Sequence, residues 1–384
     1  MDARELGLDR AQLDRTREVI AADVASERYD GAVLLVARHG RIVLHEAAGF
    51  AERSSGRPAS TEDVFHLFSV TKTFTAAAVL RCVDRGQIQL TTPVADVIPE
   101  FGVKGKHRVT IAQLLAHTGG MPRDLPFVPV DQLGNTEAVA LAVCDQALSV
   151  TPGGIVSYSP IGSYAVLGEI VRRLGGGVRP LRQIMDEELF APLGMKTTSL
   201  SLRPDLADRR VPVVVRDPTP GIIPPAALES INVLHTESFE MPGASALGTA
   251  HDLFLWAEML RRGGELGGVR ILSRALLELA LTNQTGERIS HIYDGMCEAR
   301  GWDPVPAYLG LGFFLRGEGL FPMPFGVTAS SGTFGGLGAG STIFWVDPRR
   351  DLTFVCLSSG VLEDSRNFER MQRLADLVLS AVLD

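Results

Sequence analysis

The feature that most constrains the fold is a pair of short apolar segments at each end of the chain. Residues 31–37 and 42–47 are apolar and rich in β-branched side chains, and residues 341–346 and 352–357 repeat this pattern near the other end. The second pair is separated by turn-forming residues at 347–351. Short β-branched runs joined by turns are typical of antiparallel hairpins. The sequence therefore predicts strands at both ends of the chain.

The residues between the two hairpins follow a helical period instead. Apolar side chains recur at helical spacing in 110–117, 161–174 and 250–262, and Pro- and Gly-rich stretches separate these segments. Two further helices are expected at 9–26 and 365–383. No internal repeat is found.

One economical arrangement places both chain ends in a single antiparallel sheet with helices on its faces. We therefore expect an α/β (α+β) fold. Residues 1–64 and 300–384 would form the sheet domain, and residues 65–299 would form a mostly α-helical inserted domain. The active site is expected between the two.

The strongest functional signal is an S-x-x-K motif, Ser69 to Lys72, at the start of an alanine-rich helix that is expected to end near Gly86. Residues three apart on a helix share one face. A serine hydroxyl is a poor nucleophile until a neighbouring base takes its proton. A lysine can be that base when burial lowers its pKa. The helix N-terminus also favours the negative charge that develops at Ser69.

A plain structural interpretation of the motif is that Ser69 caps the helix and Lys72 is a solvated charge. Two observations favour the catalytic interpretation. The chain has only four lysines, at positions 72, 104, 106 and 196, so a chance match to the motif is not expected. The motif also opens an apolar helix, where a solvated lysine would be out of place.

S-x-x-K is the nucleophile signature of penicillin-binding proteins and β-lactamases. The chain resembles this family, especially class C β-lactamases and family VIII esterases, from about Ala32 to the C-terminus. The matching stretches are G-Q-I-Q-L at 86–90, P-V at 93–94, T-I-A-Q-L-L-A-H-T-G-G-M at 110–121, P-G-G and Y-S-P-I-G-S-Y within 152–164, and G-G-E-L-G-G-V-R-I-L-S at 263–273. Thr91-Thr92 stand where the family has an aspartate. The resemblance implies a β-lactamase/transpeptidase-like fold, in which a sheet domain lies beside a helical domain.

The resemblance also implies a second motif at Tyr158. This phenol would handle protons together with Lys72, either as phenolate or as a relay. From the residue alone, a packed tyrosine behind a Pro-Gly turn is the more ordinary interpretation, and the link to the Ser69 motif favours the catalytic one. Pro160 stands at the substrate-binding position where the family has an asparagine, and proline has no side-chain donor. An amide-recognising contact is therefore missing.

The family's third motif is K-T-G, or H-x-G or W-x-G in the esterase branches, on a strand that ends at the site. Its best match here is the substrate-binding stretch Gly336-Leu337-Gly338. Gly336 cannot bind a substrate carboxylate as the family lysine does. The N–H groups of Ser69 and Ala339 are expected to form the oxyanion hole, because backbone donors survive such substitutions. A register shifted by one or two residues, and a glycine loop without a role, stay open.

Losing the asparagine and the cationic residue argues against an efficient β-lactamase or peptidoglycan peptidase. An ester needs less leaving-group protonation than an amide. We therefore expect a serine hydrolase of the carboxylesterase type, acting through an acyl-enzyme on an ester or activated acyl substrate. An acyltransferase that uses the same intermediate, a β-lactamase or D-peptidase, and a non-catalytic binding protein on this scaffold stay open.

Two further features have open roles. The aromatic side chains within 292–325 could line an apolar acyl pocket, or could equally be core and loop packing. His117 is expected to brace a loop beside the site rather than to act in catalysis.

The remaining features bear on partners and location. A net charge of −8 without a basic stripe makes nucleic acid an unlikely ligand, and no uncharged apolar run is long enough for a membrane span. The first ten residues lack a signal-peptide core, and the four cysteines form no CxxC pair. We expect a cytoplasmic enzyme without cofactor or metal that acts on a small molecule. The oligomeric state is left open.

Overall fold

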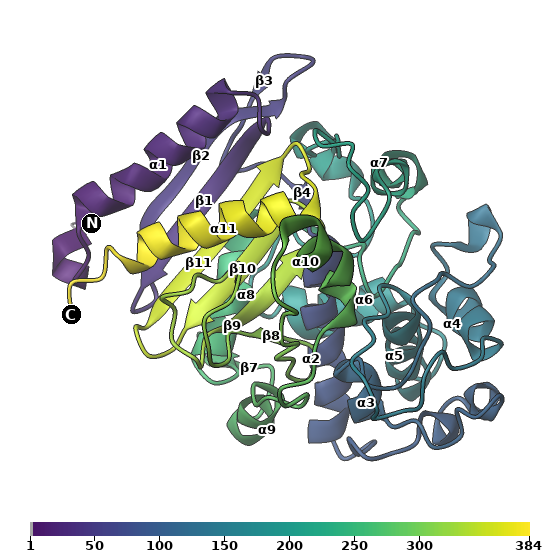
Figure 1. Cartoon of the computed structure of the whole chain (residues 1–384). Helices are drawn as coiled ribbons and strands as arrows, with labels where there is room; N and C mark the ends of the chain where they lie inside the picture. Colours follow the sequence, from purple (N-terminus) through teal and green to yellow (C-terminus); the bar gives the residue numbers. More distant parts are fainter. Residues whose placement is uncertain (1–2) are drawn as a thin grey trace.

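The computed structural model describes residues 3–384, so Met1 and Asp2 of the N-terminal segment discussed above lie outside the described residues. Its centre is a seven-stranded antiparallel sheet of order β3-β2-β1-β11-β10-β9-β8 (Figure 1). The strands of this sheet are β1 (Gly31–Arg38), β2 (Arg41–Glu52), β3 (Arg57–Pro58), β8 (Phe314–Leu315), β9 (Phe334–Gly338), β10 (Thr342–Asp347) and β11 (Leu352–Ser359). Two-stranded pairs are formed by β4 (Phe65–His66) with β5 (Leu247–Gly248), and by β6 (Glu265–Leu266) with β7 (Val269–Arg270).

The two ends of the chain meet at the middle of this sheet. Strand β1 pairs with β2 on one side and with β11 on the other, in a register that places Gly31 opposite Ser359. Both expected hairpins are present, and one antiparallel sheet contains them. The predicted fold class is confirmed.

Eleven α-helices are found within residues 3–384. They are α1 (Arg10–Ala25), α2 (Thr71–Asp84), α3 (Ile111–Leu115), α4 (Thr136–Cys144), α5 (Gly162–Leu174), α6 (Leu181–Met185), α7 (Pro225–Leu234), α8 (Ala250–Arg261), α9 (Arg274–Ala280), α10 (Asp294–Arg300) and α11 (Asp364–Leu379). No helix in this range is both long enough and apolar enough to cross a bilayer.

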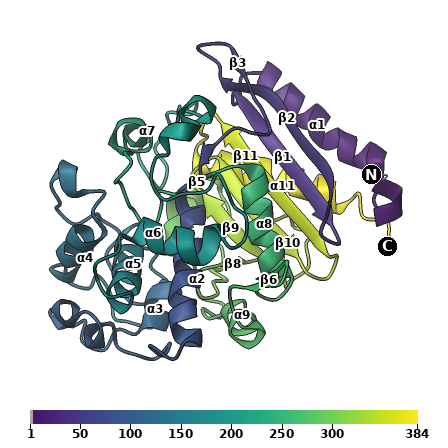
Figure 2. The same cartoon turned by 180° about the vertical axis from the view of Figure 1, so that it is seen from behind.

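The helices cover both faces of the sheet, and the alternation along β1 shows why. Leu34 and Val36 point into an apolar cluster with α1 and α11, which lie side by side on one face (Figure 1). Val33 and Leu35 point into the larger cluster on the other face, where α8 crosses the sheet (Figure 2). Successive strand residues face opposite sides of the sheet. A strand that is apolar at every position therefore needs helices on both faces.

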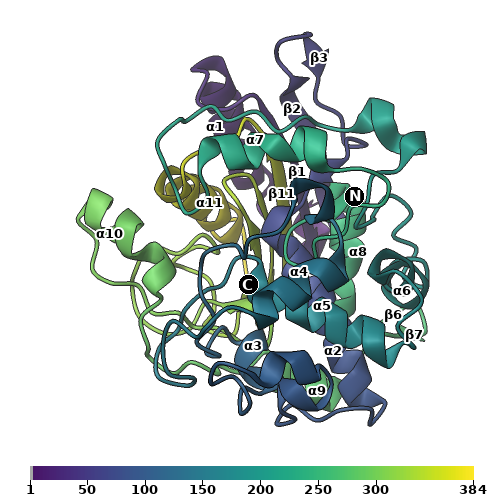
Figure 3. The same cartoon turned by 90° about the vertical axis from the view of Figure 1, so that its right-hand side faces the viewer.

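Helices α2, α3, α4 and α5 gather beside the sheet (Figure 3). The domain boundaries expected at 64/65 and 299/300 stay a prediction. Helix α8, which falls inside the range expected for the helical domain, packs on strands β1, β10 and β11. The region inserted between the hairpins thus also supplies one cover of the sheet.

The last helix is shorter than the sequence indicated. Helix α11 ends at Leu379 instead of continuing to residue 383. The residues that follow pair with the start of the chain: Leu8 and Val382 form a β-bridge, and the Leu383 N–H donates to the Gly7 carbonyl at 2.9 Å. This tertiary pairing, which the helical period cannot show, ends the helix.

We predict that Leu35→Ala lowers the free energy of unfolding by about 2–5 kcal/mol, because Leu35 is fully buried on the central strand and its truncation leaves a cavity. Urea denaturation measures the change. Val178→Ala, at a side chain that is 90% exposed, is the matched control and should change stability by less than about 0.5 kcal/mol. Equal effects of the two substitutions would contradict this placement of the core.

Candidate active site

Ser69 lies in a single 3-10 turn, Phe68–Val70, immediately before α2. The sequence placed it at the start of the helix, and the structure does so with this turn between. Every residue of α2 from Thr71 to Leu80 is buried. A helix buried on all sides belongs to the interior. The nucleophile candidate is therefore carried on one of the most enclosed elements of the molecule.

Hydrogen bonds hold this turn in a strained conformation. Phe68 has a φ of 46°, a left-handed value that is uncommon for a residue other than glycine. The hydroxyl of Thr71 donates to the Phe68 carbonyl at 2.5 Å and accepts from the Ala246 N–H at 2.9 Å. The Thr342 hydroxyl donates to the Leu67 carbonyl at 3.0 Å. Backbone strain of this kind persists where surrounding contacts over-determine it, as at active sites.

The amine of Lys72 is buried against the hydroxyl of Ser69. The side chain is only 3% exposed, and its Nζ lies 3.1 Å from Ser69 Oγ and 2.7 Å from the Gly243 carbonyl oxygen. Burial lowers the pKa of Lys72 to about 7. Near neutral pH a substantial share of the amine is thus neutral and lies within hydrogen-bond distance of the Ser69 hydroxyl.

The ring of Tyr158 completes the enclosure of this amine. Lys72 Nζ lies 5.0 Å from the Tyr158 ring centroid and 5.4 Å from that of Tyr164. Burial raises the pKa of Tyr158 above its usual value, and a hydrogen bond with the Ser69 side chain acts in the opposite direction. The net rise keeps Tyr158 a neutral phenol near pH 7. The structure therefore brings together the three residues that the sequence nominated.

His117 supports the tyrosine and not the nucleophile. Its ring centroid lies 4.3 Å from that of Tyr158, and its Nδ1 accepts from the Ser159 N–H at 3.3 Å. Burial, with a smaller contribution from the charge of Lys72, lowers the pKa of His117 to about 3, so the imidazole is neutral. His117 lies beside the Tyr158 loop, and the bracing role expected from the sequence stays a prediction.

Strand β9, which carries the third-motif match, runs past the nucleophile turn. Gly336 lines the cavity at Ser69. Leu337 packs against the apolar cluster that contains Tyr158, and Ala339 packs against the cluster that contains Phe68.

Gly338 approaches the backbone of Leu67 so closely that a Cβ would overlap it. Because of this close approach, only a glycine fits at the end of the strand. Pro160 is half-buried, and its carbonyl lies beside Gly243.

The cavity at Ser69 is small and mostly apolar. Its volume is about 10 Å³, which holds about one water molecule. Phe313 and Phe314 lie on its wall with Gly310 and Gly312. The aromatic segment of the sequence therefore contributes two side chains to the cavity. Others, such as Tyr293 and Trp302, pack in a cluster behind Tyr158.

The sequence of this chain is similar to that of known proteins over most of its length. The family model described as beta-lactamase matches residues 16–378. The chain belongs to the beta-lactamase family. As a member of it, the chain is a serine hydrolase whose reaction passes through an acyl-enzyme.

The relatives of this chain include an esterase and a penicillin-binding protein. Esterase EstB from Burkholderia gladioli is 32% identical over 291 residues, which cover 68% of this chain and 73% of that protein. Penicillin-binding protein 4 from Amycolatopsis lactamdurans is 32% identical over 297 residues, covering 72% and 73%. The crystal structure of a penicillin-binding protein homologue from Caulobacter crescentus has a TM-score of 0.80 at 25% identity, over 98% of this chain and 99% of that one.

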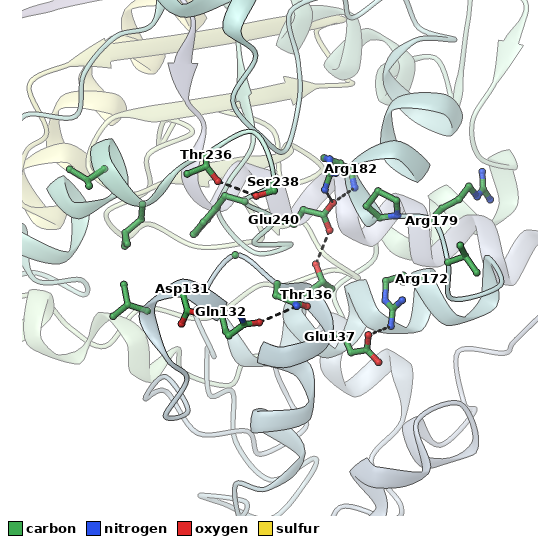
Figure 4. A pocket seen from close by; sticks show the side chains of 18 residues that line it. Asp131, Gln132, Thr136, Glu137, Arg172, Arg179, Arg182, Thr236, Ser238 and Glu240 are labelled. Atoms are coloured by element: carbon green, nitrogen blue, oxygen red, sulfur yellow. Dashed lines mark hydrogen bonds and ion pairs between the residues drawn. The ribbon is translucent and has the colours of Figure 1, made fainter.

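A much larger cavity, of about 830 Å³, shares no lining residue with the cavity at Ser69 (Figure 4). Four of its charged side chains form two ion pairs within the lining, Arg172 with Glu137 and Arg182 with Glu240, and Arg179 pairs with Glu187 outside it. Glu240 also accepts from the Thr136 hydroxyl at 3.2 Å and from the Leu181 N–H at 3.2 Å. Glu240 therefore ties its own loop to α4 and to α6.

The Glu240 loop also reaches helix α2 and Lys72. Two residues after Glu240, the Pro242 carbonyl accepts from the Thr75 hydroxyl at 2.6 Å, and the next carbonyl, of Gly243, accepts from Lys72. Sequence reasoning missed the Gly243 contact. Pro242-Gly243 signals a turn, but no side chain marks which carbonyl meets the lysine.

We predict that Gly338→Ala lowers kcat/KM by about 100-fold, because its Cβ would push β9 away from the Leu67 backbone and a misplacement of about 1 Å at a reacting centre has effects of this size. Steady-state hydrolysis of a nitrophenyl ester measures it. Gly332→Ala is the control, since a Cβ there meets only Pro348 at 3.8 Å. An unchanged kcat/KM in the position-338 variant would show that β9 does not set the site geometry.

Proposed function

We propose that this enzyme is a carboxylesterase-type hydrolase in which Ser69 is the nucleophile, Lys72 its general base and Tyr158 the acid that protonates the leaving group. The observation that carries the proposal is the 3.1 Å separation of Ser69 Oγ from a buried lysine Nζ. This is within the reach that base activation of a serine requires.

The pKa shifts of Lys72 and Tyr158 support different proton-transfer roles for the two side chains. The pKa of Lys72 falls to about 7, whereas burial moves the pKa of Tyr158 upward from its ordinary value. At neutral pH the amine is the better base and the phenol is the proton donor. An efficient general base has a pKa near the working pH, so this assignment follows for Lys72 and not for Tyr158.

The proposed steps follow from these positions. The Ser69 proton passes to Lys72 as Oγ attacks the carbonyl carbon. The oxyanion is stabilised by two backbone donors, the N–H groups of Ser69 and Ala339. The leaving alkoxide takes a proton from Tyr158, and the Lys72 ammonium restores the proton of the phenol. Water then attacks the acyl-enzyme by the same route in reverse, which releases the acid and restores Ser69.

Two features support an ester of a short acyl group as substrate. The cavity at Ser69 has room for about one water and is walled by Phe313 and Phe314. At the positions where the family has an asparagine and a lysine, this chain has Pro160 and Gly336, neither of which offers a charged or amide side chain to a β-lactam or peptide. The relative EstB is named an esterase.

The molecule that accepts the acyl group in the second step is left open. The same acyl-enzyme serves an acyltransferase when an alcohol or amine replaces water. Competition between water and added alcohols, read as acid against transfer product, separates the two activities. Hydrolysis of a chromogenic cephalosporin would instead support a β-lactamase. A cytoplasmic location is also part of the proposal, supported by four buried, unpaired cysteines.

We predict that Ser69→Ala removes acyl-enzyme formation and lowers kcat by about 10⁵–10⁶-fold, the order seen when a serine nucleophile is deleted. Intact-mass measurement after incubation with a nitrophenyl ester should show one acyl adduct on the wild type and none on the variant. Ser54→Ala, at an exposed serine, is the matched control and should retain the adduct. Undiminished turnover in the position-69 variant would refute the proposed nucleophile.

We predict that kcat/KM rises with pH through a midpoint near pH 7. Burial lowers the pKa of Lys72 to about 7, so the neutral amine needed as base accumulates above that pH and is lost below it. Lys72→Arg keeps a protonated side chain and should be inactive throughout. A pH–rate profile measures both. A midpoint near 10.5, the ordinary lysine value, would contradict the role of burial.

A further inference from the structure

A third cavity, of about 400 Å³, lies between α1, the 216–218 loop and α11, and shares no lining residue with the cavity at Ser69. The two helices run side by side on the face of the sheet seen in Figure 1. The lining includes five arginines and four carboxylates. They are Arg28, Arg216, Arg366, Arg370, Arg373, Asp23, Glu27, Asp217 and Glu369.

Four of these arginines have a carboxylate partner, and the fifth does not. Asp23 pairs with Arg28 and Arg373, Asp217 pairs with Arg366, and Asp30 pairs with Arg216. Arg370 forms no ion pair with any carboxylate of residues 3–384 within 4.0 Å. The lining therefore carries one guanidinium charge that the described part of the chain leaves uncompensated.

Arg370 is also the most deeply buried of the five, at 5% exposure. Its Nη2 donates to Asn367 Oδ1 at 2.6 Å and to Ser358 Oγ at 3.0 Å. Its Nε and Nη1 are covered and have no hydrogen-bond partner among residues 3–384. Three of the five N–H donors of a guanidinium are thus unused. A buried charge with three unused donors and no ion-pair partner is unfavourable, and so calls for a counter-charge.

A second unsatisfied group lies beside it. The Arg370 guanidinium carbon lies 4.4 Å from the centroid of the Tyr29 ring, which is 1% exposed. The Tyr29 hydroxyl has no hydrogen-bond partner among the described residues. Both side chains line the cavity. A hydroxyl without an acceptor, beside a guanidinium with unused N–H donors, points to an oxygen-rich anion as the missing partner.

We infer that this cavity binds the phosphate or carboxylate group of a small molecule, with Arg370 as its counter-charge and Tyr29 as a further donor. Guanidinium groups are well suited to both kinds of oxyanion. The arginines at the rim would admit it by changing rotamer, because the side chains of Arg28 and Arg373 are 60% and 42% exposed. Binding at this site does not depend on the proposed esterase function.

The experiment is a calorimetric titration of the full chain with inorganic phosphate, and separately with acetate, at constant ionic strength set with chloride. Saturable binding of either anion is expected. The anion that binds more tightly shows whether the site prefers a phosphate or a carboxylate group. No saturable binding of either anion at millimolar concentration would overturn the inference.

Variants locate the site. Arg370→Met should weaken binding of the tighter anion by at least about tenfold, the size expected for charge-assisted hydrogen bonds. Arg108→Met, at an exposed arginine outside the cavity, should bind as the wild type does. Tyr29→Phe removes only the unpartnered hydroxyl and should weaken binding severalfold, which keeps the test available if the position-370 variant does not fold. Binding unchanged in Tyr29→Phe, or in a folded Arg370→Met, would overturn the assignment.

Discussion

The site depends on one amine that is kept out of water. Lys72 is held between Ser69 Oγ and the Gly243 carbonyl, inside a helix that is buried on all sides. Removing solvent shifts the amine toward its neutral form, and only the neutral form can take a proton from the serine. The surrounding elements exclude water from the amine of Lys72. The loop that carries Gly243 is fixed by Glu240, and aromatic rings close the remaining sides.

Burial acts on each neighbouring ionisable group in the direction that removes its charge. The pKa of His117 falls, the pKa of Tyr158 rises, and the pKa of Lys72 falls to about 7. A single desolvated environment thus leaves the lysine as the one of the three groups that titrates near neutral pH. No carboxylate is required to orient a base, in contrast to a Ser-His-Asp arrangement.

Local signals in the sequence were sufficient for the fold and for the central pair of residues. Short apolar runs rich in β-branched residues predicted β1 and β11, and a three-residue spacing predicted that Ser69 and Lys72 would meet. The rest depends on contacts between distant segments. The Gly243 carbonyl carries no side-chain signature, the end of α11 is set by pairing with residue 7, and the strain at Phe68 arises from Thr71 and Thr342.

The pairing of Gly31 with Ser359 has a consequence for biosynthesis. A ribosome releases β1 and β2 long before β11 and α11 exist, so β1 must wait with one edge unpaired and one face only partly covered. Contacts between residues so far apart in sequence slow folding, and waiting strands of this kind are prone to aggregation. Chaperone demand during synthesis should therefore be high for this chain. A circular permutant that places β11 ahead of β1 would shorten the wait.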